Sequence, residues 1–453
     1  MGPYLDCPSP IDLLAAVAYV GRVGPSAQVA RVRENLRLDR NRARPPVLFL
    51  APPRWHGAHC TMRSLGRLGV RVYALEHRGA SPSNGSRFCA GTVRAGDNGR
   101  PIGDAAQIVD DLVRAGRRLG GATILIAGTD EWAVFVAEHA QGLAGEFRFP
   151  QPPAELVTRL ASKVGLFEIA SGYGFPTPRL VVPRSLDHVG EIAATLTYPV
   201  MVKPVVSRPD VDAKAAVSTP AELLSYAHVH AESPDDPNLL FQEYIPGTDA
   251  DVWMFTGYFD AESRCLASFT GRKLRQCPAH MGHTSLGVAE PNPELVQQAS
   301  AFLTGIGYRG IVDSGYRFDA RDGTYKILDV NPRVGGNFRQ FVSANDLDVV
   351  RALYLDLSGM PMQATDQVDG RRWLKEDSDL VAMVQYRRLG ELDVKTWLKS
   401  LRHIDEGATF AIDDPMPFFS SMALVLTDTV AGRWHRRRRS ARAAPAAAAR
   451  WAA

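Results

Sequence analysis

A short predicted strand ends in three polar residues that are spaced two apart. Tyr325–Val330 has the apolar residues of a buried strand and is bounded by Asp-Gly before it and Asn-Pro after it. Asp329, Asn331 and Arg333 leave the same face, because side chains alternate along an extended segment. Carboxylate and amide oxygens suit Mg²⁺, and a guanidinium suits phosphate, so the group predicts a site for a metal-bridged phosphate. The plain alternative is a strand end capped by a polar turn.

The N-terminal part of the chain alternates between predicted strands and predicted helices. Apolar runs typical of buried strands and helical stretches follow one another at Val47–Ala51, Val70–Ala74, Ala105–Leu119, Thr123–Ala127 and Asp130–His139. This order predicts a parallel, doubly wound sheet in a Rossmann-like domain over residues 47–149. The loop after the first strand lacks G-x-G-x-x-G, which argues against a dinucleotide-dependent dehydrogenase. Arg54, His56 and Arg78 lie in loops of this domain and are candidates for contacts with an acceptor substrate, or are solvated loop residues.

Four motifs in a fixed order carry a family resemblance. They are YPVMVKP at 198–204, LLFQEYIPG at 239–247, YRGIVDSGYRFD at 308–319 and the stretch from Tyr325 to Arg339. Together, over roughly Val47–Leu357, the chain resembles the ATP-grasp superfamily of ATP-dependent carboxylate ligases. The resemblance implies a multidomain α/β and α+β fold, with an ATP-grasp core of two α+β lobes at 150–360. It also implies ATP and Mg²⁺ as cofactors.

The resemblance implies a set of nucleotide contacts. Lys163 follows Ser162, where the family more often has Asp, and would reach the phosphates, as would Lys203 at the end of its strand. The segment that lines adenine in the family corresponds here to Gln242, Glu243, Tyr244 and Ile245. Asp249 is favoured over Asp251 as the acid that binds the ribose hydroxyls. The family's glycine-rich flap has no glycine here, so Ser207, Arg208 or Lys214 would have to contact phosphate.

Cations and a metal site complete the predicted catalytic group. Alternation along Gly271–Arg275 is expected to place Lys273 and Arg275 on one face, where with Arg333 they would neutralise the transferring phosphoryl group. Asp313 is the expected metal ligand beside Asp329 and Asn331.

In the family that the chain resembles, the position of Gly315 carries a Glu, Asp or Gln that binds Mg²⁺. Two outcomes remain open: either Asp313 and Asp329 hold the metal in altered geometry, or one Mg²⁺ is bound and turnover is low or absent. His280 and His283 form an incomplete zinc site and are expected in a loop that borders the acceptor pocket.

Composition limits the remaining possibilities. The chain of 453 residues has a net charge of +3, too small to argue for nucleic-acid binding over the whole surface. Its five cysteines are scattered and lack C-x-x-C spacing, which favours reduced thiols in the cytoplasm. The apolar run Ile11–Val20 contains an acid and lacks a basic lead, so we expect a short amphipathic helix, packed on the body or bound to a partner, and no export. Apolar runs of about 18 residues are missing, which argues against a membrane span.

The two ends of the chain are predicted to lie outside the core. Residues 1–46 form a helical leader and linker, 361–432 a helical extension, and 433–453 a basic, alanine-rich tail. The tail carries six arginines between Arg433 and Arg442. It is a solvated, disordered segment or a peripheral contact with anionic lipid. A homodimer is left open.

We expect a carboxylate–amine ligase that forms an amide through an acyl phosphate, with a small-molecule carboxylate and an amine as substrates. The alternative is an ATP-binding scaffold with weak or no turnover, suggested by Gly315 and the glycine-free flap.

Overall fold

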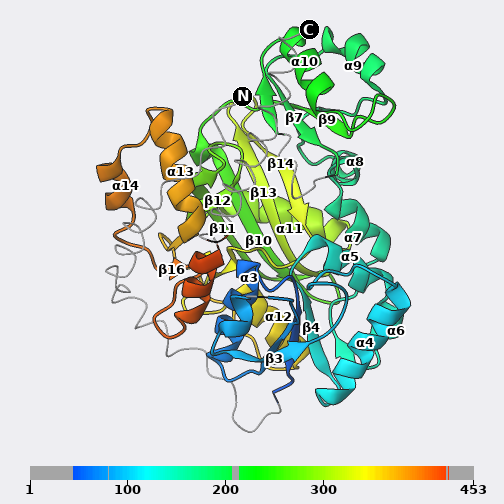
Figure 1. The fold of residues 1–453 in the computed structure, drawn as a ribbon, viewed down its shortest axis with the longest axis vertical. Coiled ribbons are helices and arrows are strands. Elements are labelled where there is room, and N and C mark those ends of the chain that lie inside the picture. Colours follow the sequence, from blue (N-terminus) through cyan, green and yellow to red (C-terminus); the bar gives the residue numbers. More distant parts are fainter. Residues whose placement is uncertain (1–43, 80, 207–213, 425–426, 428–453) are drawn as a thin grey trace, which may run out of the picture.

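The structure is a computed structural model that describes residues 44–79, 81–206, 214–424 and 427. Its first domain, blue to cyan in Figure 1, is a five-stranded parallel sheet in the order β3-β2-β1-β4-β5. The predicted Rossmann-like domain is therefore confirmed. Its elements are β1 (Val47–Leu50), α3 (His56–Gly66), β2 (Val72–Leu75), β3 (Cys89–Val93), α4 (Ala105–Arg118), β4 (Thr123–Ala127), α5 (Asp130–Glu138), α6 (Ala140–Leu143) and β5 (Phe147–Arg148).

A small second lobe lies at the top of Figure 1 and contains a four-stranded antiparallel sheet in the order β6-β9-β7-β8. Alternate residues of β7, such as Val200 and Val202, are buried under its two helices, while Lys203 belongs to the other face. The elements are β6 (Leu180–Val181), α9 (Leu186–Ala193), β7 (Val200–Pro204), β8 (Ala215–Val217), α10 (Pro220–His230) and β9 (Leu239–Glu243).

The large lobe is built on a seven-stranded sheet in the order β14-β13-β10-β11-β12-β15-β16. Its strands pair antiparallel except for the last two, which pair in parallel. Within this sheet, the motif at 308–319 pairs antiparallel with the stretch from Tyr325. The elements are β10 (Val252–Phe259), β11 (Cys265–Cys277), β12 (His283–Ala289), α11 (Pro293–Gly305), β13 (Gly310–Asp319), β14 (Thr324–Asn331), α12 (Val349–Leu357), β15 (Arg372–Leu374), α13 (Glu376–Arg388), α14 (Val394–Ser400) and β16 (Glu406–Gly407).

Polar residues set the boundaries of several helices. Residues 154–173 form two helices, α7 (Ala154–Ala161) and α8 (Lys163–Tyr173), because Ser162 is extended and caps the second through Gly165 N. Helix α12 begins at Val349, where the Asp348 carboxylate accepts two backbone N–H bonds. The extension expected to be helical also supplies β15 and β16 to the large sheet.

The first domain and the large lobe share one hydrophobic core. Phe49 and Met62 from the first domain lie in the same buried cluster as Phe338 and Tyr354 from the large lobe. Burial of this continuous apolar surface fixes the two parts relative to each other.

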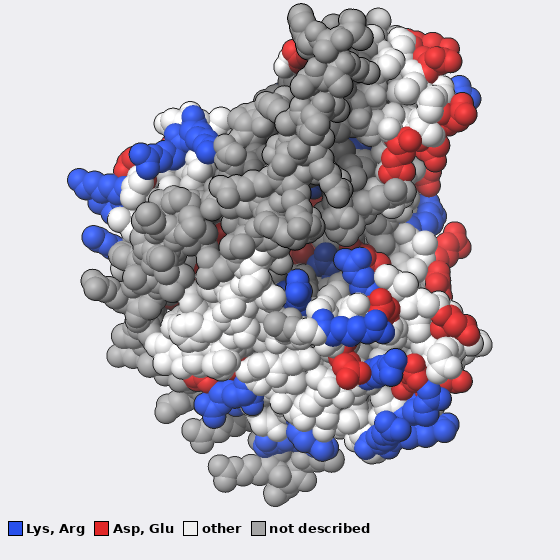
Figure 2. Space-filling model, viewed as in Figure 1, with Lys and Arg blue, Asp and Glu red and all other residues white. Residues whose placement is uncertain are grey.

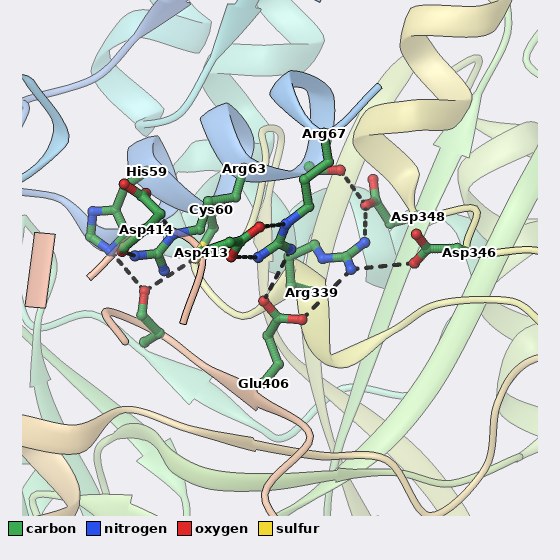
Figure 3. Close-up of polar contacts among 12 residues, drawn as sticks. His59, Cys60, Arg63, Arg67, Arg339, Asp346, Asp348, Glu406, Asp413 and Asp414 are labelled. Atoms are coloured by element: carbon green, nitrogen blue, oxygen red, sulfur yellow. Dashed lines mark hydrogen bonds and ion pairs between the residues drawn. The ribbon is translucent and has the colours of Figure 1, made fainter. Parts of the chain in front are cut away.

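A buried network of charges ties the C-terminal segment to the same junction. Figure 3 shows α3 presenting Arg63 and Arg67 to Asp414 and Asp413, with 2.9 Å ion pairs in both cases. Arg339 pairs with Asp348 at 2.7 Å and lies 3.6 Å from Glu406. Buried ions are stable only when paired, so residues 406–414 are held firmly against the first domain.

Several predictions fall on residues outside the described part of the chain. These are the leader up to residue 43, Ser207 and Arg208 of the flap, and the basic tail. In the described ranges, every helix is too short or too polar to cross a membrane. On the face shown in Figure 2, basic and acidic side chains are interspersed over the surface of the described residues.

Candidate active site

A cavity of about 1110 Å³ lies between the small lobe and the large sheet. It is walled by both sheets, by the start of α3 and by residues of the C-terminal segment. The residues that the sequence proposed as catalytic, nucleotide-binding or metal-binding groups of the ATP-grasp core line it, apart from the flap residues outside the described ranges. They are Lys163, Lys203, Gln242, Glu243, Tyr244, Ile245, Asp249, Lys273, Arg275, Asp313, Asp329, Asn331 and Arg333.

The polar residues of β14 meet those of β13 through strand pairing. Asp313 lies opposite Asn331, and Gly315 lies opposite Asp329. The Asn331 amide nitrogen donates to the Asp313 backbone oxygen at 3.1 Å, and its Oδ1 accepts from Arg333 Nη2 at 3.0 Å. The register therefore brings two carboxylates, one amide oxygen and one guanidinium to the same edge of the sheet.

This edge fits a hard divalent cation. Burial raises the pKa of Asp313 to about 6, against the opposing effect of Arg333, so the carboxylate is mostly ionised at neutral pH. Gly335 lies against the Asp313 carboxyl, where a Cβ would come within 2.5 Å of its carbon. Across the described ranges, no three His, Cys, Asp or Glu side chains cluster to hold a metal. Two carboxylates with waters and phosphate oxygens are the ligand set that suits Mg²⁺.

Three lysines converge on the cavity from different elements. Lys163 Nζ donates to the backbone oxygens of Pro204 and Val205 at 3.0 and 3.2 Å, and Lys203 Nζ donates to Gln242 Oε1 at 2.8 Å. Lys273 Nζ donates to Gly282 O at 3.1 Å. Burial lowers the pKa of all three, that of Lys203 to about 8. Lys203 and Lys273 donate to neutral oxygens, and buried ammonium groups of this kind favour an anionic ligand.

Arg275 differs from these lysines. Its guanidinium binds the Asp379 carboxylate through two 2.8 Å hydrogen bonds and donates to Ser400 Oγ at 2.9 Å. The regular alternation expected for Gly271–Arg275 fails, because the pairing of β11 with β12 is irregular between Lys273 and Arg275. Arg275 thus joins β11 to α13 and α14, and we remove it from the group that would contact phosphate.

The predicted adenine and ribose contacts lie on β9 and on the short segment that joins it to β10. Glu243 Oε1 pairs with Arg321 at 2.6 Å, and its Oε2 accepts from Arg179 N at 3.1 Å, so this side chain is held by the protein itself. The Asp249 carboxylate already has polar partners within the protein. It accepts from Gln276 Nε2 at 2.8 Å and from the Tyr386 hydroxyl, and lies 3.1 Å from His280 Nδ1.

The sequence reasoning missed Asp130 and Trp55. Asp130 Oδ1 accepts from Arg333 Nε at 3.1 Å, and the Arg333 guanidinium lies 6.0 Å from the centre of a Trp55 ring. Asp130 is the first residue of α5, directly after β4 and the cap Thr129. Ligand-binding residues gather at the carboxyl ends of parallel strands, which is the signal that would have found it.

The sequence also proposed Arg54, His56 and Arg78 of the first domain as substrate contacts, and they differ in whether they reach the cavity. His56 lines the cavity, with ring centres 5.7 Å from Trp55 and 5.9 Å from Trp373. Arg54 and Arg78 are exposed and do not line it. His280 and His283 both line it, as expected for a loop bordering a pocket.

Comparison with known proteins supports the resemblance. No protein-family model matches the chain. It is 27% identical over 240 residues to the D-aspartate ligase of Enterococcus faecium (strain Aus0004), a match covering 50% of this chain and 57% of that protein. The chain thus spans little more than half the length of this curated relative.

Solved structures show the same fold. The L-amino acid ligase of Bacillus licheniformis aligns with a TM-score of 0.51 and 16% identity, covering 70% of this chain and 75% of that one. The biotin carboxylase domain dimer of Hydrogenobacter thermophilus 2-oxoglutarate carboxylase, solved with MgADP, ADP and bicarbonate, aligns with a TM-score of 0.54 and 14% identity, covering 71% of each chain. The chain is therefore similar in fold to ATP-grasp carboxylate–amine ligases, and over half of its length it is similar in sequence to one of them.

Proposed function

We propose that this protein is an ATP-dependent carboxylate–amine ligase, which joins a carboxylate and an amine into an amide with release of ADP and phosphate. The observation that supports this most is the gathering of Lys163, Lys203 and Lys273 with Asp313 and Asp329 around one cavity. Buried cations opposite a pair of carboxylates suit a triphosphate with its metal. The ligases named among its relatives support the same reaction class.

The nucleotide would lie between the lobes. The backbone of Glu243–Ile245 offers the adjacent donor and acceptor that an adenine edge requires, with Ile245 as an apolar wall. Lys163 and Lys203 would exchange their present oxygen partners for phosphate oxygens, which carry full charge. Asp313, Asp329 and Asn331 would hold Mg²⁺, which when bound neutralises phosphate charge and orients the transferred group.

The chemistry proposed for the cavity has two steps. An oxygen of the substrate carboxylate attacks the γ-phosphorus of ATP, forming a C–O–P linkage while the bond to ADP breaks. The amine then attacks the acyl carbon, phosphate leaves with the C–O electron pair, and the nitrogen loses a proton. Lys273 and Arg333 face the region where charge develops, so their part is to stabilise the phosphoryl oxygens.

Asp130 positions Arg333 for that task. It holds Nε at 3.1 Å, while Asn331 holds Nη2 at 3.0 Å, so the guanidinium is fixed from two sides. A fixed donor fork costs no reorganisation when the transition state forms. The Trp55 ring lies on one face of the same group, 6.0 Å from the guanidinium carbon, and adds a cation–π contact.

We further propose amino acids as the carboxylate substrates and the cytoplasm as the compartment. The names of two relatives, a D-aspartate ligase and an L-amino acid ligase, support the substrate class. Cell fractionation with an antibody to the chain tests the compartment.

The competing function is a nucleotide-binding scaffold without turnover. Gly315 motivates it, because glycine offers no oxygen to a second metal. The space beside Gly315 is filled by the Asp329 carboxylate itself, so the site retains an acid at this position. We therefore favour the enzyme.

A single experiment separates the two functions. The full chain is incubated with ATP, Mg²⁺ and pairs of amino acids, and ADP and new amides are measured by coupled assay and mass spectrometry. The ligase requires ADP release that depends on both substrates and an amide in equal amount. Tight ADP binding by calorimetry with no product from any pair would instead identify a scaffold.

A further inference from the structure

A second group of polar residues lines the cavity beside the residues that we assign to the nucleotide and the metal. His56 begins α3, Gly336 and Asn337 follow β14, and His283 and Thr284 begin β12. Gly336 lies so close to His56 that a Cβ there would come within 2.3 Å of Nε2. These segments come from two domains, and together they form one wall, which we call the distal subsite.

Two hydrogen-bond donors of the distal subsite share a weak acceptor, the sulfur of a methionine. Asn337 Nδ2 and Thr284 Oγ1 both donate to the sulfur of Met254, each at 3.2 Å. A thioether is a weak hydrogen-bond acceptor, and both side chains are more than nine-tenths buried. A carboxylate oxygen entering here would accept these bonds far better than sulfur does.

The C-terminal segment supplies positive charge behind this wall. Lys375 Nζ donates to Ser378 Oγ at 2.7 Å, and His283 Nε2 lies 3.0 Å from the same hydroxyl. Lys375 also pairs with Asp377 at 2.6 Å. Burial is the largest cause that lowers the pKa of both His56 and His283, and the charge of Lys375 is the second. Asp377 acts in the opposite direction but more weakly, so the positive charge of Lys375 is felt at both imidazoles. Lys273 adds to it from β11.

We propose that the distal subsite binds a second carboxylate of the substrate, so that the carboxylate substrate is a dicarboxylic amino acid. Asn337, Thr284 and the two imidazoles would hold this group, with Lys375 as the source of compensating charge. The first carboxylate would then lie towards Lys273 and Arg333, where it is phosphorylated. This inference rests on the proposed ligase function and adds the substrate class to it.

The C-terminal segment is thereby part of substrate recognition. Trp373 of β15 lines the cavity beside His56, and Lys375 and Ser378 follow it directly. The buried ion pairs of residues 406–414 with α3 in Figure 3 hold β16 in place, and β16 pairs with β15.

The test compares substrates that differ by one carboxylate. Binding of aspartate and of alanine to the full chain with ADP and Mg²⁺ is measured by calorimetry, and kcat/KM by amide formation. Aspartate, as D or L isomer, is expected to be preferred. Lys375→Met should reduce the preference about 10-fold through a higher KM, because it removes a charge-assisted contribution, while KM for ATP stays the same. Lys375→Arg should restore most of the preference.

Two further variants guard against a trivial loss of folding. Thr284→Val removes a hydroxyl with little change in shape and should weaken aspartate binding but not ADP binding. Arg272→Met is the matched control, because Arg272 lies beside Lys273 on β11, is 31% exposed and pairs with Glu290 at 2.6 Å. It should leave the aspartate preference unchanged, with thermal midpoints reported for every variant.

Each outcome has a definite meaning. Equal or tighter binding of alanine, or an unchanged preference in both Lys375→Met and Thr284→Val, overturns the distal subsite and leaves the ligase proposal intact. A chain that forms no amide with any pair overturns the ligase proposal. Calorimetry on the same protein then still shows whether aspartate binds through Lys375.

Discussion

Gly315 lies directly opposite Asp329, and a Cβ at position 315 would come within 2.2 Å of Asp329 Oδ1. The glycine therefore makes room for the carboxylate that we assign to the metal. The atom in the way is the end of a mobile side chain, so a larger residue would displace the carboxylate without disturbing the backbone.

We predict that Gly315→Ala impairs function and leaves folding intact. The displaced Asp329 carboxylate should raise the Mg²⁺ concentration needed for half-maximal activity by about 10-fold or more, as for other changes that misplace metal ligands. Magnesium titrations of ADP release check this. Gly190→Ala in α9, where an added Cβ meets nothing within 4 Å, is the control. An unchanged magnesium requirement in Gly315→Ala would remove Asp329 from the metal site.

Asp130 is predicted to act through Arg333. Asp130→Asn keeps the size of the side chain but removes the charge facing Arg333 Nε. We expect kcat to fall about 10-fold or more with little change in KM for ATP, because a misaligned donor matters most in the transition state. Steady-state kinetics measure both constants. Glu131→Gln, at the exposed neighbouring position, should behave as wild type, and equal losses in the two variants would count against the assignment.

Nucleotide affinity is predicted to depend on the protonation of Lys203. Burial lowers the pKa of this ammonium to about 8, so in the free protein its charge is present below pH 8 and is lost as the pH rises through that value. The dissociation constant for ADP should therefore increase above pH 8, as calorimetry between pH 6.5 and 9.5 would show. Lys203→Arg should flatten this dependence, because a guanidinium stays charged. A flat profile in the wild type would place Lys203 away from the phosphates.

The charge network at α3 is predicted to govern stability. Arg63 and Asp414 are both 1% exposed, so Arg63→Met leaves a buried carboxylate without its partner. This should lower the free energy of unfolding by about 3–5 kcal/mol. Arg114→Met, which breaks an ion pair with half of the arginine exposed, should cost about 1 kcal/mol or less. Urea denaturation compares the two, and similar small losses would show that the network contributes little.

Local pattern was sufficient for much of the fold and for the set of residues around the cavity. The period-two spacing of Asp329, Asn331 and Arg333 and the apolar run before Lys203 depend only on strand geometry, which the structure keeps. The parallel first sheet likewise followed from the order of its strands and helices.

What the sequence could not provide depends on contacts between distant segments. An irregular pairing turns Arg275 towards Asp379, which is 104 positions away, and no local pattern marks that irregularity. Asp130 meets Arg333 only because two domains pack together. The short strands β15 and β16 exist because the edge of a large sheet is there to pair with them.

The transfer of oxygen from substrate to phosphate tests the central claim most directly. The carboxylate substrate is labelled with ¹⁸O, the reaction is run with ATP, Mg²⁺ and the amine, and the released phosphate is analysed by mass spectrometry. An acyl phosphate formed in this cavity requires one ¹⁸O atom in each phosphate, with ADP and amide in equal amounts. Unlabelled phosphate, or AMP and pyrophosphate in place of ADP, would contradict the account.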